Sequence, residues 1–137
     1  SEVKVVAYDA SGKPAEEKVI RTAGKPHHLE LVADRTRLSA DGKDLAYITV
    51  RVVDKDGNLC PADSRMVNFS VKGAGKYRAA ANGDATSLDL FHLPKMPAFS
   101  GQLTAIVQSG EQAGEIVFEA RAKGLKSGKL VLYTSEK

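Results

Sequence analysis

The decapeptide LAYITVRVVD at residues 45–54 alternates apolar and polar side chains along most of its length. The apolar set consists of Ala46, Ile48, Val50 and Val52. The opposite set consists of Tyr47, Thr49 and Arg51. Because successive side chains of a β-strand point to opposite faces, this alternation predicts a strand in a sheet that is buried on one side. The stretch therefore favours an all-β fold.

The same period of two recurs along the chain between clusters of turn-forming residues. It predicts seven strands, at residues 27–33, 45–54, 66–72, 76–81, 103–109, 115–122 and 129–134. No segment keeps a helical period over a dozen residues, and we expect a long irregular loop at residues 85–101. Since seven strands are typical of a constant-type immunoglobulin domain, the sequence predicts an immunoglobulin-like β-sandwich.

Two further strands precede this sandwich. Residues 3–9 and 16–22 flank a turn and predict a β-hairpin, after which Gly24 and Pro26 interrupt the pattern. We therefore expect two units, a terminal hairpin at residues 1–24 and a sandwich domain at residues 25–137. A lone hairpin is marginally stable in water and its strand edges tend to pair. We expect it to dock on the sandwich, on a second copy of the chain or on another domain.

Composition limits the classes of function. The chain has 137 residues, with 20 basic and 17 acidic residues interspersed and a net charge of +3, which fits about one soluble domain. Two short basic patches, at residues 72–78 and 121–129, lack the interleaved aromatic residues of a nucleic-acid platform. No apolar run approaches the roughly 20 residues of a membrane helix, and no secretory signal opens the chain. We therefore expect neither nucleic-acid binding nor membrane insertion.

The residues that usually carry catalysis or bind metals lack the necessary spacing. Cys60 is the single cysteine and has no histidine nearby in the sequence. His27 and His28 are adjacent on a predicted strand, so we expect them to point to opposite faces and not to bind one ion. Glu115 and Glu119 are two strand repeats apart, which does not suit the carboxylate pair of a glycosidase. We expect no catalytic residue, no cofactor and no metal ion.

Acidic turns leave one hypothesis for a cation site. The turn that begins at Asp54 resembles the start of a calcium loop, but Gly57 stands at its fourth position where an EF-hand needs glycine at the sixth. An Asx-rich hairpin turn is the better interpretation. A weaker calcium site would need two loops to converge, because its ligands would be Asp41, Asp44, Asp54 and Asp56.

Aromatic side chains are the remaining candidates for a binding surface. Tyr47, Tyr77, Phe91 and Phe99 could contact an oligosaccharide by ring stacking, or could pack on another domain. The chain contains no tryptophan, on which carbohydrate-binding surfaces often depend. We therefore favour packing in the core or between domains for these four residues.

The stretch ADGKDLAYITVRVVDKDGNLCPA at residues 40–62 resembles the C-terminal immunoglobulin-like domain of bacterial β-galactosidases of glycoside hydrolase family two. Further similar segments follow in the family's order: VNFSV at 67–71, NGDATS at 82–87, AFSG at 98–101, AIVQS at 105–109 and GLKS at 124–127. Residues 3–24 are similar to the last hairpin of the β-sandwich domain that precedes this one in those enzymes. Cys60 departs from the family, in which an aliphatic residue is common at this position.

The resemblance implies a non-catalytic accessory domain of a retaining glycosidase that serves bacterial carbohydrate metabolism. The catalytic glutamates of that family lie on a TIM barrel, which alone takes about 250 residues, and no position of this chain matches their motifs. The resemblance also implies that the partners are other domains of a parent enzyme, and that the parent is exported to the periplasm or beyond. A carbohydrate-binding module and an adhesin-type bacterial immunoglobulin-like repeat are the alternatives.

Overall fold

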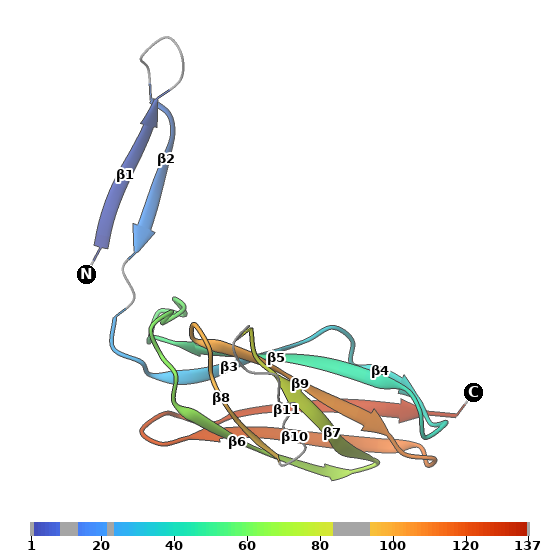
Figure 1. The fold of residues 1–137 in the computed structure, drawn as a ribbon. Helices are drawn as coiled ribbons and strands as arrows, with labels where there is room; N and C mark the ends of the chain where they lie inside the picture. Colours follow the sequence, from blue (N-terminus) through green and yellow to red (C-terminus); the bar gives the residue numbers. More distant parts are fainter. Residues whose placement is uncertain (1, 9–13, 22–23, 84–93, 137) are drawn as a thin grey trace.

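The computed structural model describes residues 2–8, 14–21, 24–83 and 94–136, and the regular elements of this part are β-strands (Figure 1). They are β1 (Glu2–Tyr8), β2 (Pro14–Arg21), β3 (His28–Ala33), β4 (Arg37–Ser39), β5 (Leu45–Val53), β6 (Met66–Gly73), β7 (Gly75–Ala81), β8 (Lys95–Pro97), β9 (Gln102–Ser109), β10 (Gly114–Ala122) and β11 (Gly128–Ser135). The described residues include no helix with the length and apolarity needed to span a membrane.

Two sheets face each other in a sandwich. One sheet has the strand order β3-β5-β9-β7, and the other has the order β4-β11-β10-β6-β8. When the short strands β4 and β8 are set aside, these orders are A-B-E-D and G-F-C, the connectivity of a constant-type immunoglobulin domain. The predicted immunoglobulin-like β-sandwich is therefore confirmed.

The core lies between the two sheets and is built from the inward side chains of the alternating strands. Ile48, Val50 and Val52 of β5 are at most 1% exposed, as the alternation at residues 45–54 predicts. From the other sheet, the Phe118 ring is fully buried and its centroid lies 5.7 Å from that of Phe69. Burying side chains of this size stabilises the fold by about 1.5–3 kcal/mol each.

The chain crosses from one sheet to the other at the turn between β6 and β7. Gly73 at this turn has a φ of +94°, and a Cβ atom there would lie 2.1 Å from the carbonyl oxygen of Glu115. The glycine therefore allows the β6–β7 turn to contact β10 directly. This position explains why the Gly-Ala-Gly segment at residues 73–75 is a turn, as its sequence predicts.

The seven predicted sandwich strands are present within two residues of their expected ends, but two others were missed. β4 pairs in parallel with β11, and β8 pairs in antiparallel orientation with β6. Each has only three residues, which is too short to show a period of two. β8 interrupts the predicted loop at residues 85–101, and residues 84–93 of that loop lie outside the described part of the chain.

The strand directions define two ends of the sandwich. At the end that we call the linker pole, β3, β6, β9 and β11 begin, and β5, β7 and β10 end. The linker, residues 24–27, enters the sandwich at this pole (Figure 1). The opposite end, which we call the far pole, carries residues 40–44 and 110–113 and the β6–β7 turn.

The N-terminal hairpin is present as predicted. β1 and β2 pair with each other in antiparallel register, and neither joins either sheet of the sandwich in the described part of the chain. Figure 1 draws the hairpin on the side of the linker pole. The expected docking through strand pairing with the sandwich is therefore not observed, whereas self-association through the hairpin stays a prediction.

Candidate functional site

At the linker pole, the Asp54 carboxylate holds the linker against the sandwich. Its Oδ2 atom accepts hydrogen bonds from the Gly24 amide at 2.8 Å and from Asn58 Nδ2 at 3.2 Å. Its Oδ1 atom accepts from the amides of Asp56 and Asn58, each at 2.9 Å. These donors, Gly24 first and Asn58 second, hold the pKa of Asp54 well below its usual range although burial opposes them. The carboxylate is therefore ionised at any physiological pH.

Backbone hydrogen bonds fix the rest of the linker. The His27 amide donates to the Val53 carbonyl at 2.8 Å, and the His27 carbonyl accepts from the Lys126 amide at 3.1 Å. The Leu29 amide donates in turn to the Lys126 carbonyl at 3.1 Å. The linker is thus held between the end of β5 and the β10–β11 loop, so the direction in which the chain leaves the sandwich is set by the fold.

Cys60 lies beneath this linker. Its side chain is 5% exposed, and its Sγ atom is 3.7 Å from the Gly24 carbonyl oxygen. Burial raises the pKa of the Cys60 thiol, and the negative charges of Asp54 and Asp63 raise it further. Since the thiolate is the nucleophilic form, these effects suppress reactivity. Cys60 is therefore a packing residue.

An ion pair within the β5–β6 loop holds Arg65 in place at the linker pole. Arg65 donates from Nε and Nη2 to Asp63 Oδ2, at 2.9 and 2.7 Å, and from Nη1 to the Lys123 carbonyl at 2.8 Å. Burial alone would raise the pKa of Asp63, but the hydrogen bonds and charge of Arg65 outweigh it and lower that pKa. The ion pair fixes the Arg65 side chain, and the bond from Arg65 to Lys123 ties the β5–β6 loop to the β10–β11 loop.

The two adjacent histidines are in contact, against expectation. Their Nδ1 atoms lie 2.9 Å apart, and their rings meet edge to face with centroids 5.1 Å apart. The expectation of opposite faces was wrong because His27 precedes β3, so strand alternation does not constrain its side chain. The described residues hold no group of three or more His, Cys, Asp or Glu side chains suited to a metal ion. The histidine pair thus forms a hydrogen bond at the linker, with one ring nitrogen as donor and the other as acceptor.

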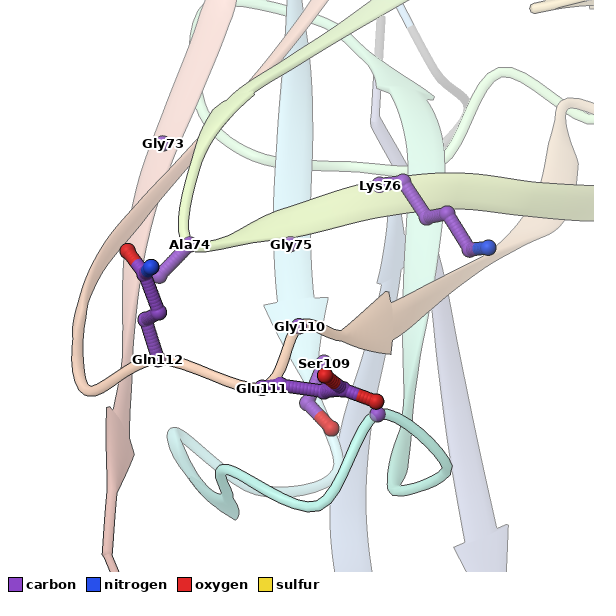
Figure 2. A pocket seen from close by; sticks show the side chains of 9 residues that line it. Gly73, Ala74, Gly75, Lys76, Ser109, Gly110, Glu111 and Gln112 are labelled. Carbon is purple, nitrogen blue, oxygen red and sulfur yellow. The ribbon is translucent and has the colours of Figure 1, made fainter.

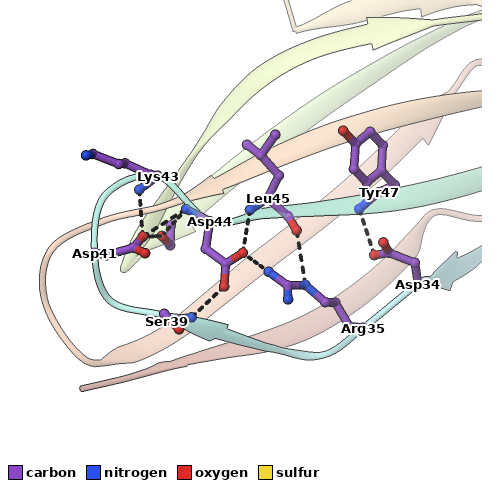
Figure 3. Close-up of polar contacts among 9 residues, drawn as sticks. Asp34, Arg35, Ser39, Asp41, Lys43, Asp44, Leu45 and Tyr47 are labelled. Atoms are coloured by element: carbon purple, nitrogen blue, oxygen red, sulfur yellow. Dashed lines mark hydrogen bonds and ion pairs between the residues drawn. The ribbon is translucent and has the colours of Figure 1, made fainter. Parts of the chain in front are cut away.

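The acidic residues of the far pole order the loop before β5 (Figure 3). Asp41 Oδ1 accepts from the amides of Lys43 and Asp44 at 2.8 and 2.9 Å. Asp44 accepts from the Ser39 amide at 2.8 Å and forms an ion pair with Arg35. These carboxylates therefore bind their own loop.

The four-aspartate calcium hypothesis is wrong. Asp41 and Asp44 precede β5, whereas Asp54 and Asp56 follow it. A strand rises about 3.3 Å per residue, so the two pairs are separated by about 30 Å. The loops that carry them lie at opposite poles and do not converge.

The far pole also has a hollow of about 470 Å³ between the β6–β7 turn and residues 109–112 (Figure 2). Glycine backbone forms much of its lining, and the side chains of Lys76, Glu111 and Gln112 stand at its rim. A Cβ atom at Gly75 would lie 2.6 Å from Ile116 Cδ1, so the close approach of the two sheets explains that glycine. No aromatic ring lines this hollow, and we assign it no ligand.

The glutamates considered for catalysis are separated on one strand. Glu115 and Glu119 lie four positions apart on β10, or about 13 Å at the usual rise of a strand. The carboxylates of a glycosidase lie at most about 10 Å apart. Glu119 Oε1 instead lies 3.7 Å from Arg121 Nε in an ion pair at the surface.

The four aromatic candidates do not form one platform. Tyr47 is 44% exposed on the outer face of β5, and Phe99 is 40% exposed after β8. Tyr77 turns inward, where its ring stacks on Phe69 at a centroid distance of 5.9 Å, and burial raises its pKa. Phe91 lies outside the described residues. Tyr47 and Phe99 therefore remain available at the surface, whereas Tyr77 packs against the core.

The connection between Asp54 and Gly24 was missed by reasoning from the sequence. The Asx-rich turn after β5 was visible as a local pattern, and Gly24 was visible as an interruption between two units. Their contact joins residues 30 positions apart. A local pattern contains no signal for that pairing.

Comparison with known proteins identifies the family of this domain. The sequence profile of glycoside hydrolase family 2 C-terminal domain 5 matches residues 29–131. The β-galactosidase BoGH2A of Bacteroides ovatus is 41% identical over 134 residues, which are 98% of this chain and 16% of that protein. A solved glycosyl hydrolase family 2 member from Bacteroides cellulosilyticus superposes with a TM-score of 0.88 at 29% identity, over 97% of this chain and 17% of that one.

A domain of another class shares only the architecture. The D00–D0 domain of intimin has a TM-score of 0.60 at 16% identity, over 98% of this chain and 64% of that one, which shows a common fold alone.

The chain spans 16% of the length of its curated β-galactosidase relative, and the matched region is a C-terminal domain and not the catalytic one. The expected family and the expected accessory nature of the domain are therefore confirmed. This chain belongs to the C-terminal domain 5 family of glycoside hydrolase family 2 proteins.

Proposed function

We propose that this domain is a non-catalytic accessory module of a β-galactosidase-type glycoside hydrolase, in which it orients a neighbouring domain. The observation that carries the proposal is the hydrogen bond from Gly24 to Asp54, because it fixes the linker at the end of the sandwich. The bonds of His27 to Val53 and Lys126 hold the same segment from two sides. A linker that was only a tether would not need a buried carboxylate to anchor it.

The hairpin fits this role as part of the neighbouring unit. We assign residues 1–24 to the end of a preceding β-sandwich domain and residues 25–137 to the C-terminal domain. In support, β1 and β2 pair only with each other among the described strands, and the family profile begins at residue 29. The parent reading frame tests this assignment, since it should encode a β-sandwich and a TIM barrel upstream. A frame with no glycosidase barrel would overturn the proposal.

The decisive experiment uses the parent enzyme with and without residues 25–137. We expect the truncated enzyme to retain its catalytic groups, and thus to keep kcat on a small chromogenic galactoside within about tenfold at low temperature. Its melting temperature should fall, because the neighbouring domain loses a packed partner. Loss of all activity in a truncated enzyme that is still folded would instead place a catalytic group in this domain.

We also propose that the parent enzyme is exported, on the basis of the family resemblance. Fractionation of the source cells tests this point separately. Activity found in the periplasm or medium supports it, and activity confined to the cytosol contradicts it.

A further inference from the structure

The outer face of the β3-β5-β9-β7 sheet carries a hollow of about 400 Å³ near the linker pole. Its floor crosses three strands, because Thr49 of β5, Thr104 of β9 and Ala81 of β7 lie opposite one another in register. Asn82 and Gln102 stand at its edge, and Asn82 Nδ2 donates a hydrogen bond to the Pro97 carbonyl at 2.9 Å. The hollow thus combines the hydroxyl groups of two threonines and the Gln102 amide with a largely apolar lining.

The hollow exists because β7 has small outward side chains. Ala79 and Ala81 lie opposite Ile106 and Thr104 of β9, and Gly83 follows directly after the strand. Because these residues have small side chains or none, the outer surface is recessed along β7 compared with the centre of the sheet. A larger side chain at Ala81 would fill the space.

Phe99 borders the hollow on one side. Its amide donates to the Gln102 carbonyl at 3.0 Å, and the Gln102 amide donates back to the Phe99 carbonyl at 3.2 Å. A Cβ atom at Gly83 would lie 3.5 Å from Phe99 Cδ2, so the ring lies directly beside that glycine. The backbone of Phe99 is therefore fixed while its ring remains 40% exposed.

Tyr47 lies on the same strand as Thr49, outside the residues that line the hollow. It precedes Thr49 by two positions on β5 and shares its face, so the two side chains are about 6.6 Å apart along the strand. This spacing is close to the length of one sugar unit. The Tyr47 amide is held by Asp34 Oδ1 at 2.8 Å, and its side chain is 44% exposed. Phe99 and Tyr47 therefore place two accessible aromatic rings near the hollow.

The chemistry of this face is that of a neutral, hydroxyl-rich ligand. None of the residues that line the hollow carries a charge, and the neighbouring Arg51 is paired with Glu30. Hydroxyl and amide groups donate and accept hydrogen bonds, as sugar hydroxyls do, while an aromatic face packs on the apolar face of a pyranose ring.

We propose that this face binds a neutral oligosaccharide, with one sugar unit in the hollow beside Phe99 and the next over Tyr47. Thr49, Thr104 and Gln102 provide the polar contacts. The domain would then hold a glycan chain near its parent enzyme in addition to orienting a neighbouring domain. This binding is a property of the chain itself, so its failure would leave the accessory function standing.

The test is a titration of the 137-residue chain, labelled with 15N, with neutral β-1,4-linked tetrasaccharides of galactose, glucose, mannose and xylose. We expect at least one of them to shift the amide signals of residues 47–51, 82–83 and 99–104 with a Kd between about 0.1 and 5 mM. Phe99→Ala should weaken that binding at least about tenfold, and Tyr47→Ala by about three- to tenfold. A tetramer of galacturonic acid should bind more weakly than its neutral counterpart.

Tyr133→Ala is the matched control, because Tyr133 is 41% exposed on the opposite sheet and should not affect binding. The proposal is overturned if no tetrasaccharide shifts these signals at about 10 mM, if the shifts lie elsewhere, or if the Phe99 variant binds normally. Hydrogen exchange of the parent enzyme tests whether this face is instead covered by another domain. Slower exchange at residues 47–51 and 99–104 in the parent than in the chain alone would assign this face to domain docking and exclude the oligosaccharide.

Discussion

The carboxylate of Asp54 accepts a hydrogen bond from the amide of Gly24, 30 positions earlier in the chain, at 2.8 Å. Asp54 is 4% exposed and directly follows β5, the strand whose alternation predicts the fold. The same carboxylate orders the turn that follows this strand through Asp56 and Asn58. One side chain thus couples a local turn to the direction in which the linker leaves the sandwich.

Replacing this carboxylate should loosen the linker. Asp54→Asn keeps the size of the side chain but places an NH2 group against amide donors that now have no acceptor. We expect the melting temperature of the chain to fall by roughly 5–10 °C, and the Gly24 amide to exchange faster with solvent. Asp56→Asn is the control, since the Asp56 side chain is exposed in the same turn. Equal effects of the two substitutions would contradict a specific role of Asp54.

Acid should weaken the domain through two carboxylates. Hydrogen bonds from Gly24 and Asn58 lower the pKa of Asp54, and Arg65 lowers that of Asp63 against the effect of burial. A carboxyl group whose pKa is lower in the folded state than in the unfolded state stabilises the fold at any pH above the unfolded-state pKa of about 3.9. This stabilisation is lost as the pH falls towards the pKa of the folded state. The melting temperature should therefore change little down to about pH 5 and fall below about pH 4. Asp54→Asn should reduce this acid dependence, and an unchanged dependence would argue against the assignment.

Substitution of two glycines distinguishes the cost of a left-handed backbone conformation from the cost of a steric clash. Gly73 and Gly57 have φ values of +94° and +86°, but a Cβ atom at Gly73 would lie 2.1 Å from the Glu115 carbonyl, whereas one at Gly57 would meet nothing within 4 Å. Gly57→Ala should therefore cost only the left-handed conformation, about 1–2 kcal/mol of the free energy of unfolding. Gly73→Ala should cost more than about 3 kcal/mol, because β6 or β10 must also move. Urea unfolding of both variants measures the difference, and equal costs would show that the β6–β7 turn can shift freely.

Local alternation was sufficient to predict the seven longer strands, because each buries one face against the opposite sheet. It could not predict β4 or β8, whose three residues pair with strands distant in the sequence. The aromatic candidates show the same limit. Tyr47 and Tyr77 both lie within predicted strands, yet one faces solvent and the other stacks on Phe69. The hollow beside Phe99 depends on the register of β5, β9 and β7, which pairs Thr49 with Thr104 and cannot be obtained from any single segment.

The Cys60 thiol offers a direct measure of whether the linker covers the sandwich. Its Sγ atom lies 3.7 Å from the Gly24 carbonyl, and both burial and the nearby carboxylates raise its pKa. A disulfide reagent must therefore wait for the linker pole to open, and we expect the folded chain to react at least about 100-fold more slowly than the unfolded chain. Ellman's reagent, followed by absorbance, measures this rate.

Removing the anchor of the linker should increase that rate. Asp54→Asn breaks the contact that holds Gly24 over Cys60, so we expect the thiol to react about tenfold faster in this variant at a temperature where it remains folded. Asp56→Asn should leave the rate unchanged. If Asp54→Asn has no effect, then the linker does not control access to Cys60, and the thiol is protected instead by the β5–β6 loop in which it lies.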